Sequence, residues 1–152
     1  MYSRRRKAIL LADDSEEDIA IFQRAFRKAE IDADVFLVKD GQEAIDYLEG
    51  TGQFRDRKAY PLPCLVLLDL KMPKFDGFDV LRWLEREPTL KKLPVTVLTS
   101  SDEDKDVDLA YGLGANSYLV KPASLSGYAR LVAELREYWL HMNRPPGAGL
   151  NQ

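Results

Sequence analysis

The residues of this chain best suited to chemistry are five polar side chains, each of which closely follows a short apolar run. They are Asp13, Asp14, Asp69, Thr99 and Lys121. If the runs are strands of one parallel sheet, their carboxyl ends share an edge, and side chains far apart in the sequence converge there. Three carboxylates, a hydroxyl and an amine suit a hard divalent cation with a phosphoryl group placed between the cation and an ammonium.

The pattern of apolar residues supports such a sheet. Short β-rich runs alternate with longer segments of helical period, which is typical of βαβ units and an α/β fold. We expect strands near 8–12, 35–38, 64–69, 94–98 and 117–120, and helices near 16–29, 41–49, 77–87, 103–113 and 125–142. Three pairs have capping-box spacing at helix starts: Ser15 with Asp18, Asp40 with Glu43, and Asp76 with Asp79.

The chain length of 152 residues predicts one domain. We place this domain at 8–142, between a basic N-terminal tail (1–7) and a flexible C-terminal tail (143–152) whose prolines stop the last helix. The segment 50–63 contains two glycines and two prolines, and we expect an exposed loop there.

Composition argues against several classes of function. A formal net charge of −3 gives no general reason to expect nucleic acid as a partner. No apolar stretch approaches the roughly 20 residues that span a bilayer, and the start lacks a signal-peptide core, so we expect no membrane partner and a cytoplasmic protein. Cys64, the single cysteine, cannot form an internal disulfide, and His141, the single histidine, offers no imidazole metal site.

Each candidate residue, taken alone, also has an ordinary structural explanation. Asp13 and Asp14 are suited to capping the helix that follows them, because the helix dipole favours carboxylates there. Asp69 alone could be a turn residue, Thr99 a helix-entry residue and Lys121 a solvated surface lysine. Their conjunction at four strand ends favours a shared site instead.

Four stretches around these residues form a recognisable pattern. They are ILLADDS at 9–15, LLDLKMP at 67–73 followed by DG at 76–77, VLTS at 97–100 and YLVKP at 118–122. Together they resemble the receiver domain of bacterial two-component response regulators. The resemblance implies a flavodoxin-like, doubly wound (βα)5 fold with a five-stranded parallel sheet in the order 2-1-3-4-5. The segment 50–54 further resembles the stand-alone receivers that serve cyanobacterial phytochrome histidine kinases.

The resemblance implies a role for each matching residue. Asp69 would accept a phosphoryl group from a phosphohistidine of a sensor histidine kinase. Mg²⁺ would be held directly by Asp14 and Asp69, through a water by Asp13, and by the backbone carbonyl of Lys71. Because Lys71 occupies the position of the general acid in aspartate-nucleophile phosphatases, which the 67–73 stretch also resembles, a hydrolase is disfavoured.

The remaining roles concern charge stabilisation and signal output. Lys121 would stabilise the phosphoryl oxygens, and a cis peptide bond before Pro122 would aim it inward. Thr99 would donate its hydroxyl to the phosphoryl group, and Tyr118 would change rotamer with it. The surface made by the helix at 103–113, the strand at 117–120 and the helix at 125–142 would change as a result.

That surface also predicts partners. On the helix at 103–113, Val107, Ala110 and Tyr111 are expected to pack inward, which leaves Leu109 and Leu113 for a second copy in a homodimer. Output would reach a downstream protein target or a phosphotransfer protein, and the sequence does not choose between them. No enzyme activity is expected beyond the chain's own phosphorylation and dephosphorylation. The alternative function is a receiver-fold adaptor that binds partners independently of phosphorylation.

Overall fold

A parallel five-stranded sheet organises the computed structural model, which describes residues 6–144. The strands are β1 (Lys7–Ala12), β2 (Ala33–Val38), β3 (Leu65–Leu68), β4 (Val95–Thr99) and β5 (Ser117–Val120). Their spatial order is β2-β1-β3-β4-β5, with every neighbouring pair parallel. The predicted flavodoxin-like α/β fold is therefore confirmed.

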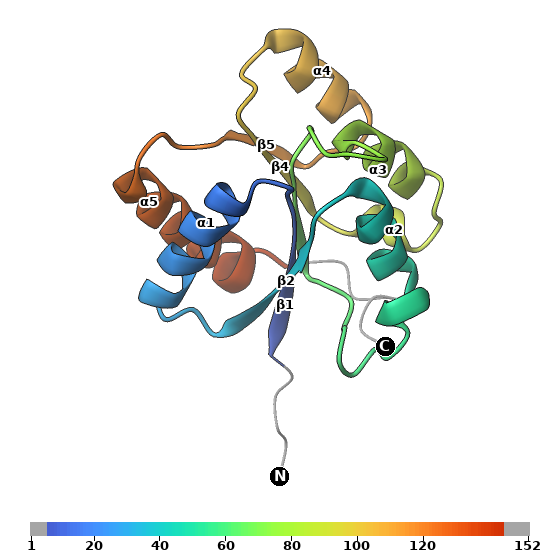
Figure 1. Cartoon of the computed structure of the whole chain (residues 1–152), viewed down its shortest axis with the longest axis horizontal. Coiled ribbons are helices and arrows are strands. Elements are labelled where there is room, and N and C mark those ends of the chain that lie inside the picture. The colour runs from blue at the N-terminus through green and yellow to red at the C-terminus, as the bar shows by residue number, and fades with distance from the viewer. Residues whose placement is uncertain (1–5, 145–152) are drawn as a thin grey trace.

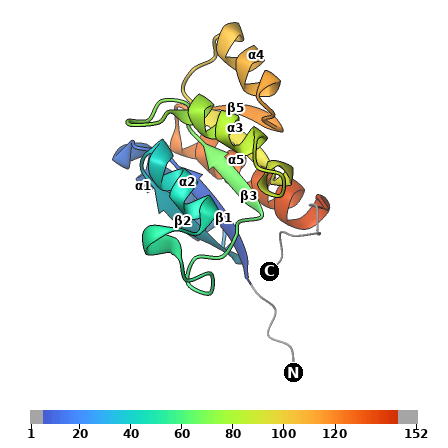
Figure 2. The same cartoon turned by 90° about the vertical axis from the view of Figure 1, so that its right-hand side faces the viewer.

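Helices cover both faces of the sheet. They are α1 (Glu16–Lys28), α2 (Gly41–Glu49), α3 (Gly77–Glu85), α4 (Asp104–Gly112) and α5 (Leu125–Leu135). α1 and α5 pack together on one face, whereas α2 and α3 pack together on the other, with α4 beyond α3 (Figures 1 and 2). Within 6–144 no helix combines the length and the apolarity needed to cross a membrane.

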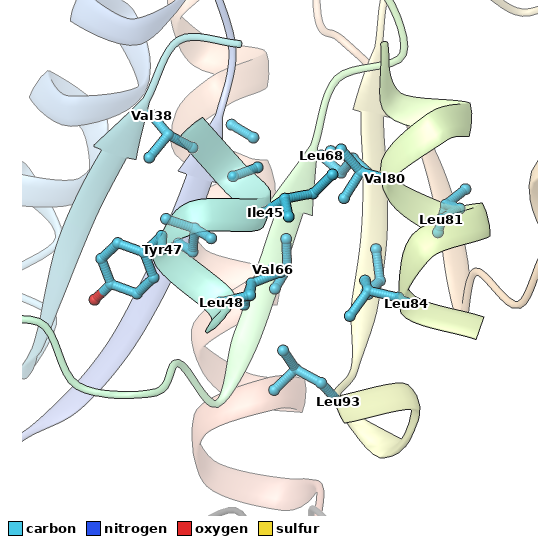
Figure 3. Close-up of a cluster of buried hydrophobic side chains, with 14 of the residues drawn as sticks. Val38, Ile45, Tyr47, Leu48, Val66, Leu68, Val80, Leu81, Leu84 and Leu93 are labelled. Atoms are coloured by element: carbon cyan, nitrogen blue, oxygen red, sulfur yellow. The ribbon is translucent and has the colours of Figure 1, made fainter. Parts of the chain in front are cut away.

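The two helical layers explain why the central strands are apolar without interruption. In β3, Leu65 and Leu67 belong to the core under α1 and α5, whereas Val66 and Leu68 belong to the core under α2 and α3. Figure 3 shows the second core, where Val66 and Leu68 meet residues of α2 and α3 such as Ile45 and Val80. Successive strand residues point to opposite faces, so a strand buried on both sides needs apolar residues at every position.

Local capping fixes the starts of the first three helices. The side chains of Ser15, Asp40 and Asp76 accept hydrogen bonds from backbone N–H groups three residues later, at 3.3, 2.8 and 2.9 Å. Only Asp76 forms the reciprocal box, because the Asp79 carboxylate accepts from the Asp76 N–H at 3.1 Å. All three N-caps are as predicted, but the carboxylates of Asp18 and Glu43 bind other groups.

The expected exposed loop at 50–63 is wrong in one respect, because part of it is pinned to α2. Phe54, in the short helix η1 (Gly52–Phe54), is buried and packs against Tyr47 with ring centroids 5.0 Å apart. The guanidinium of Arg57 donates to the carbonyls of Tyr47 and Leu48, both at 2.7 Å, and so supplies donors that the end of α2 lacks. Tyr47 in turn donates to the Pro61 carbonyl at 2.8 Å.

The two ends of the predicted domain also differ from expectation. Lys7 begins β1, and Arg6 pairs with Asp32 and Asp34 at 2.7 and 3.0 Å, so these two residues of the predicted basic tail are held at the sheet. The rest of that tail, 1–5, and residues 145–152 of the predicted C-terminal tail lie outside the described residues.

The last predicted helix, 125–142, divides in two. The α-helix stops at Leu135, and a π-helix, η3 (Arg136–Met142), follows it. The wider turn of a π-helix keeps Leu140, which is buried, on the same side as Leu135 and Val132. Leu140 thus packs in the core under α1 because the helix changes from α to π. The spacing of apolar residues in the sequence does not reveal this change. Another short helix, η2 (Leu90–Lys92), precedes β4.

Gly77 sets how closely α3 approaches the end of β3. A Cβ atom at this position would lie 2.3 Å from the Asp69 carbonyl oxygen and 2.8 Å from the Leu70 Cα atom. The Gly77 N–H also donates to the Leu70 carbonyl at 2.9 Å. Only a residue without a side chain allows the helix to start against the backbone of Asp69.

We therefore expect Gly77→Ala to lower the free energy of unfolding by about 2 kcal/mol, because the backbone that holds Asp69 must shift. Urea unfolding followed by circular dichroism measures this. The matched control is Gly112→Ala at the end of α4, where no atom lies within 4 Å of an added Cβ. It should raise stability by about 0.5 kcal/mol. Equal changes in the free energy of unfolding for the two substitutions would contradict the claim that the close contact of Gly77 with the Asp69 backbone matters for stability.

Candidate functional site

The carboxyl edge of the sheet brings the five predicted site residues into one region. Hydrogen bonds of the sheet continue one residue beyond β1, β3 and β5: the N–H of Asp13 donates to the Val38 carbonyl, that of Asp69 to the Ala12 carbonyl, and that of Lys121 to the Thr99 carbonyl, at 3.0, 2.9 and 2.7 Å. The backbones of these residues are therefore fixed by the sheet itself rather than by mobile loops. Five residues separated in sequence share one edge because the strands are parallel.

Lys121 lies at the centre of the site. Its Nζ is 2.8 Å from an oxygen of Asp13, 2.8 Å from Asp69 and 2.7 Å from Asp18. The side chains of Lys121 and Asp69 are both only 8% exposed, so the pairing is shielded from water. Burial by itself would lower the pKa of Lys121, but the hydrogen bonds that its ammonium donates to the three carboxylates outweigh burial and raise the pKa above its ordinary value. The ammonium therefore stays charged at physiological pH.

The pKa of Asp13 shows that the carboxylates of the site repel one another. Burial raises the pKa of Asp13, and repulsion from Asp69 adds to this, although hydrogen bonds from Lys121 and from the Ser15 N–H at 2.9 Å oppose the rise. The ionised carboxyl is thus less favourable here than in water. One ammonium does not fully compensate the acidic residues around it, and a further cation would be stabilised.

The acidic residues form a geometry that can hold such a cation. Asp13, Asp14 and Asp69 each offer a carboxylate oxygen, and these oxygens lie within 4.8 Å of one another. Asp13 and Asp69 are buried whereas Asp14 is exposed, so the cluster opens to solvent on the Asp14 side. Carboxylate oxygens that leave room for water suit Mg²⁺, which keeps several of its waters.

A groove of about 710 Å³ begins at Asp14 and extends toward α4. It is lined mainly by the loop between β3 and α3 and by the start of α4: Asp14, Leu70, Lys71, Met72, Pro73, Asp76, Phe78, Glu103, Lys105 and Asp106. Lys71 lies on this wall, and its N–H donates to Asp69 at 3.4 Å. The role of its carbonyl as a metal ligand stays a prediction.

Thr99 and Tyr118 differ in how their hydroxyls are used. Thr99 is fully buried, and its hydroxyl has no hydrogen-bond partner among residues 6–144. The hydroxyl of Tyr118, which is half-buried, donates to the Ser101 carbonyl at 2.8 Å. A buried hydroxyl without a partner is costly, so Thr99 has a donor available for a group that enters the site.

One detail inferred from the resemblance is wrong. The peptide bond between Lys121 and Pro122 is trans, like every peptide bond of the described chain. Lys121 still points inward, because three carboxylates hold its ammonium there.

The packing predicted for α4 is only partly correct. Leu109 is exposed and Ala110 is buried as expected, but Tyr111 is 48% exposed and Leu113 packs against the core. Tyr111 and Leu113 thus have the opposite of their expected positions. The reason is that α4 stops at Gly112, and Leu113 belongs to the turn that leads inward to β5. Tyr111 therefore joins Leu109 on the outer surface.

Asp18 is the site residue that the sequence did not reveal. Its spacing from Ser15 predicted a capping box, and the Ser15 hydroxyl does accept from the Asp18 N–H. The carboxylate does not accept from the Ser15 N–H, as a capping box requires, and instead accepts from the Lys121 ammonium. The available signal was its position one helical turn after Asp14, which places it on the turn of α1 nearest the sheet edge.

Comparison with known proteins shows clear similarity over most of the chain. Residues 9–134 match the family described as the response regulator receiver domain. FilR2 of Methanothrix harundinacea, a probable methanogenesis regulatory protein, is 42% identical over 142 residues, which cover 91% of this chain and 87% of FilR2. The response regulator Rcp1 of Synechocystis is 36% identical over 93% of this chain and 95% of its own length.

Solved structures agree with the sequence comparison. The structure of the phosphorylated cyanobacterial phytochrome response regulator RcpA is 36% identical, with a TM-score of 0.86, and covers 94% of this chain and 100% of that one. The Mn²⁺-bound structure of Rcp1 has a TM-score of 0.82 and 35% identity over 93% of this chain and 99% of its own.

We expect Mg²⁺ to stabilise this protein and Asp14→Asn to weaken its binding by more than about tenfold, because a charged oxygen ligand is lost. At a hundredfold excess over Kd, Mg²⁺ should add about 2.7 kcal/mol to the free energy of unfolding. Thermal unfolding across a Mg²⁺ titration measures both. Asp108→Asn removes an equal charge from the exposed side of α4 and should leave the affinity within about twofold. A similar loss in both variants would argue against a specific cluster.

Proposed function

Because the chain belongs to the family of response regulator receiver domains, we propose that it accepts a phosphoryl group on Asp69 from a sensor histidine kinase. Receiver domains in general take this group from a histidine kinase. The observation that carries the proposal is the buried contact of Lys121 with Asp69 and Asp13, beside a carboxylate cluster open to solvent at Asp14.

In the proposed reaction, an Asp69 carboxylate oxygen attacks the phosphorus of a phosphohistidine. A P–O bond forms as the P–N bond breaks, and the imidazole leaves with its electron pair and takes up a proton. Mg²⁺ held by Asp13, Asp14, Asp69 and the Lys71 carbonyl would supply positive charge beside the transferred group. Lys121 would supply the second positive charge from the opposite side.

Thr99 and Tyr118 would carry the chemical event to the surface. The free hydroxyl of Thr99 would donate to the phosphoryl group. Movement of Thr99 would open space for the ring of Tyr118, which would then leave the Ser101 carbonyl and turn inward. Because Ser101 precedes α4 and Tyr118 lies on β5, the α4-β5-α5 surface would change shape.

The identity of the kinase is proposed from the relatives. RcpA is a cyanobacterial phytochrome response regulator, so we propose a phytochrome histidine kinase as the donor for this chain. FilR2 is a probable regulator of methanogenesis at comparable coverage. The stimulus would therefore be a property of the kinase rather than of the receiver.

The output is proposed to be protein contact in the cytoplasm, without nucleic acid, membrane or a small-molecule substrate. The partner would be a downstream target or a phosphotransfer protein. A homodimer through α4-β5-α5 is proposed from three exposed apolar side chains on α4 and β5, namely Leu109, Tyr111 and Val120.

The first test is intact-protein mass after incubation with acetyl phosphate and Mg²⁺. We expect a gain of one phosphoryl group that requires the metal and is abolished in Asp69→Asn, because the attacking carboxylate is lost. Asp108→Asn, with the same change on exposed α4, should be phosphorylated as the wild type is. If no donor, small molecule or kinase, phosphorylates the wild type, the phosphorylation-independent adaptor is favoured.

A second test concerns the α4-β5-α5 surface. We expect beryllium fluoride with Mg²⁺ to change hydrogen exchange in α4 and β5 and to favour a dimer by light scattering. Leu109→Asp should restore the monomer mass, because it places a charge in an apolar contact. Met142→Asp alters an exposed apolar residue at the end of η3 and should not change the mass. Unchanged exchange would refute the switch, and a wild type that stays monomeric would refute the dimer.

A further inference from the structure

Asp18 differs from the other carboxylates around Lys121 in being outside the metal cluster. Its Oδ2 lies 2.7 Å from the Lys121 Nζ, the shortest of the three contacts. The cluster of oxygens within 4.8 Å of one another contains Asp13, Asp14 and Asp69 but not Asp18. Asp18 therefore binds the ammonium from α1 and lies outside the group of oxygens that could hold a cation.

The local structure of α1 leaves the Asp18 carboxylate free for this contact. In a capping box it would accept from the N–H of Ser15, but that N–H donates to Asp13 at 2.9 Å. The carboxylate thus has no backbone partner to satisfy at the start of the helix. Its side chain is 33% exposed, so the contact lies at the rim of the site rather than in the core.

The α5 side of this rim is closed by Tyr128. This residue is 3% exposed, and burial followed by the charge of Asp18 raises its pKa to about 12. The phenol is therefore neutral at physiological pH and adds no charge beside the pair of Asp18 and Lys121. A neutral wall on one side strengthens the ion pair, because less water screens it.

The distribution of partners has a consequence when a cation binds. Two of the three carboxylates on Lys121, Asp13 and Asp69, are also oxygens of the metal cluster. A cation at the cluster and the ammonium would compete for them. Among residues 6–144, Asp18 is the one carboxylate partner of Lys121 that a cation at the cluster leaves available.

Resting on the proposed function, we infer that Asp18 is a positioning residue for Lys121. It holds the ammonium on the α1 side, so that a cation can take Asp13 and Asp69 while Lys121 stays in place to meet a phosphoryl group. In this role Asp18 touches neither the cation nor the phosphoryl group. Without Asp18, Lys121 has only the carboxylates that the cation needs.

The test is a double-mutant cycle on Mg²⁺ affinity, measured by calorimetry without any phosphoryl donor. Asp18→Asn should weaken Mg²⁺ binding about tenfold in the wild type, because the ammonium then competes for Asp13 and Asp69. In a Lys121→Met background there is no ammonium to position, and the same substitution should cost less than about threefold through the lost charge alone. An equal loss in both backgrounds, or no loss in the wild type, overturns the inference.

Two further variants keep the test decisive if Lys121→Met does not fold. Asp18→Glu retains a carboxylate that can reach the ammonium, and its affinity should be within about twofold of the wild type. Glu17→Gln removes a neighbouring exposed charge of α1 and should also stay within about twofold. If Glu17→Gln lowers the Mg²⁺ affinity as much as Asp18→Asn does, the loss of a negative charge explains the effect and the inference fails.

The cycle also separates this inference from the proposed function. Mg²⁺ affinity is measured without phosphorylation, so a chain that never accepts a phosphoryl group can still show the coupling between Asp18 and Lys121. Conversely, a chain that is phosphorylated on Asp69 but shows no coupling retains the proposed function and refutes the positioning role.

Discussion

The pairing of one buried ammonium with three carboxylates is the interaction on which this structure depends. Lys121 draws together side chains that follow β1 and β3 and one from the first turn of α1. These carboxylates repel one another, as the raised pKa of Asp13 records. The parallel sheet is the constraint that makes the pairing possible. It holds the backbones of Asp13, Asp69 and Lys121 at one edge even though the two carboxylates repel each other.

The sequence predicted those features that are set by local pattern. The strands were evident because burial on both faces demands unbroken apolar runs, and the N-caps Ser15, Asp40 and Asp76 were evident because capping acts over three residues. The convergence of the site residues followed from the parallel arrangement. Phe54 was missed, because the glycines, prolines and charges around it signal exposure, and only the contacts of Arg57 with α2 reverse that signal.

Other misses arose where one residue suited two structures. Asp18 satisfies the spacing of a capping box and also the geometry of an ion pair, and the choice is made by Lys121 from a distant strand. The π-helix is similar, since the sequence permits a continuous α-helix and the burial of Leu140 decides otherwise. The cores are thus readable from hydrophobic pattern, whereas polar side chains take their partners from tertiary structure.

The contact between Asp18 and Lys121 spans 103 positions of the chain. During synthesis, Asp13, Asp18 and Asp69 all leave the ribosome before Lys121, their shared partner, has been added to the chain. Until then the contacts of Lys121 with Asp13, Asp18 and Asp69 cannot form, and the final strand is also needed to complete the sheet. Contacts of such long range form late and slowly, so the domain gains its charge balance only as a whole.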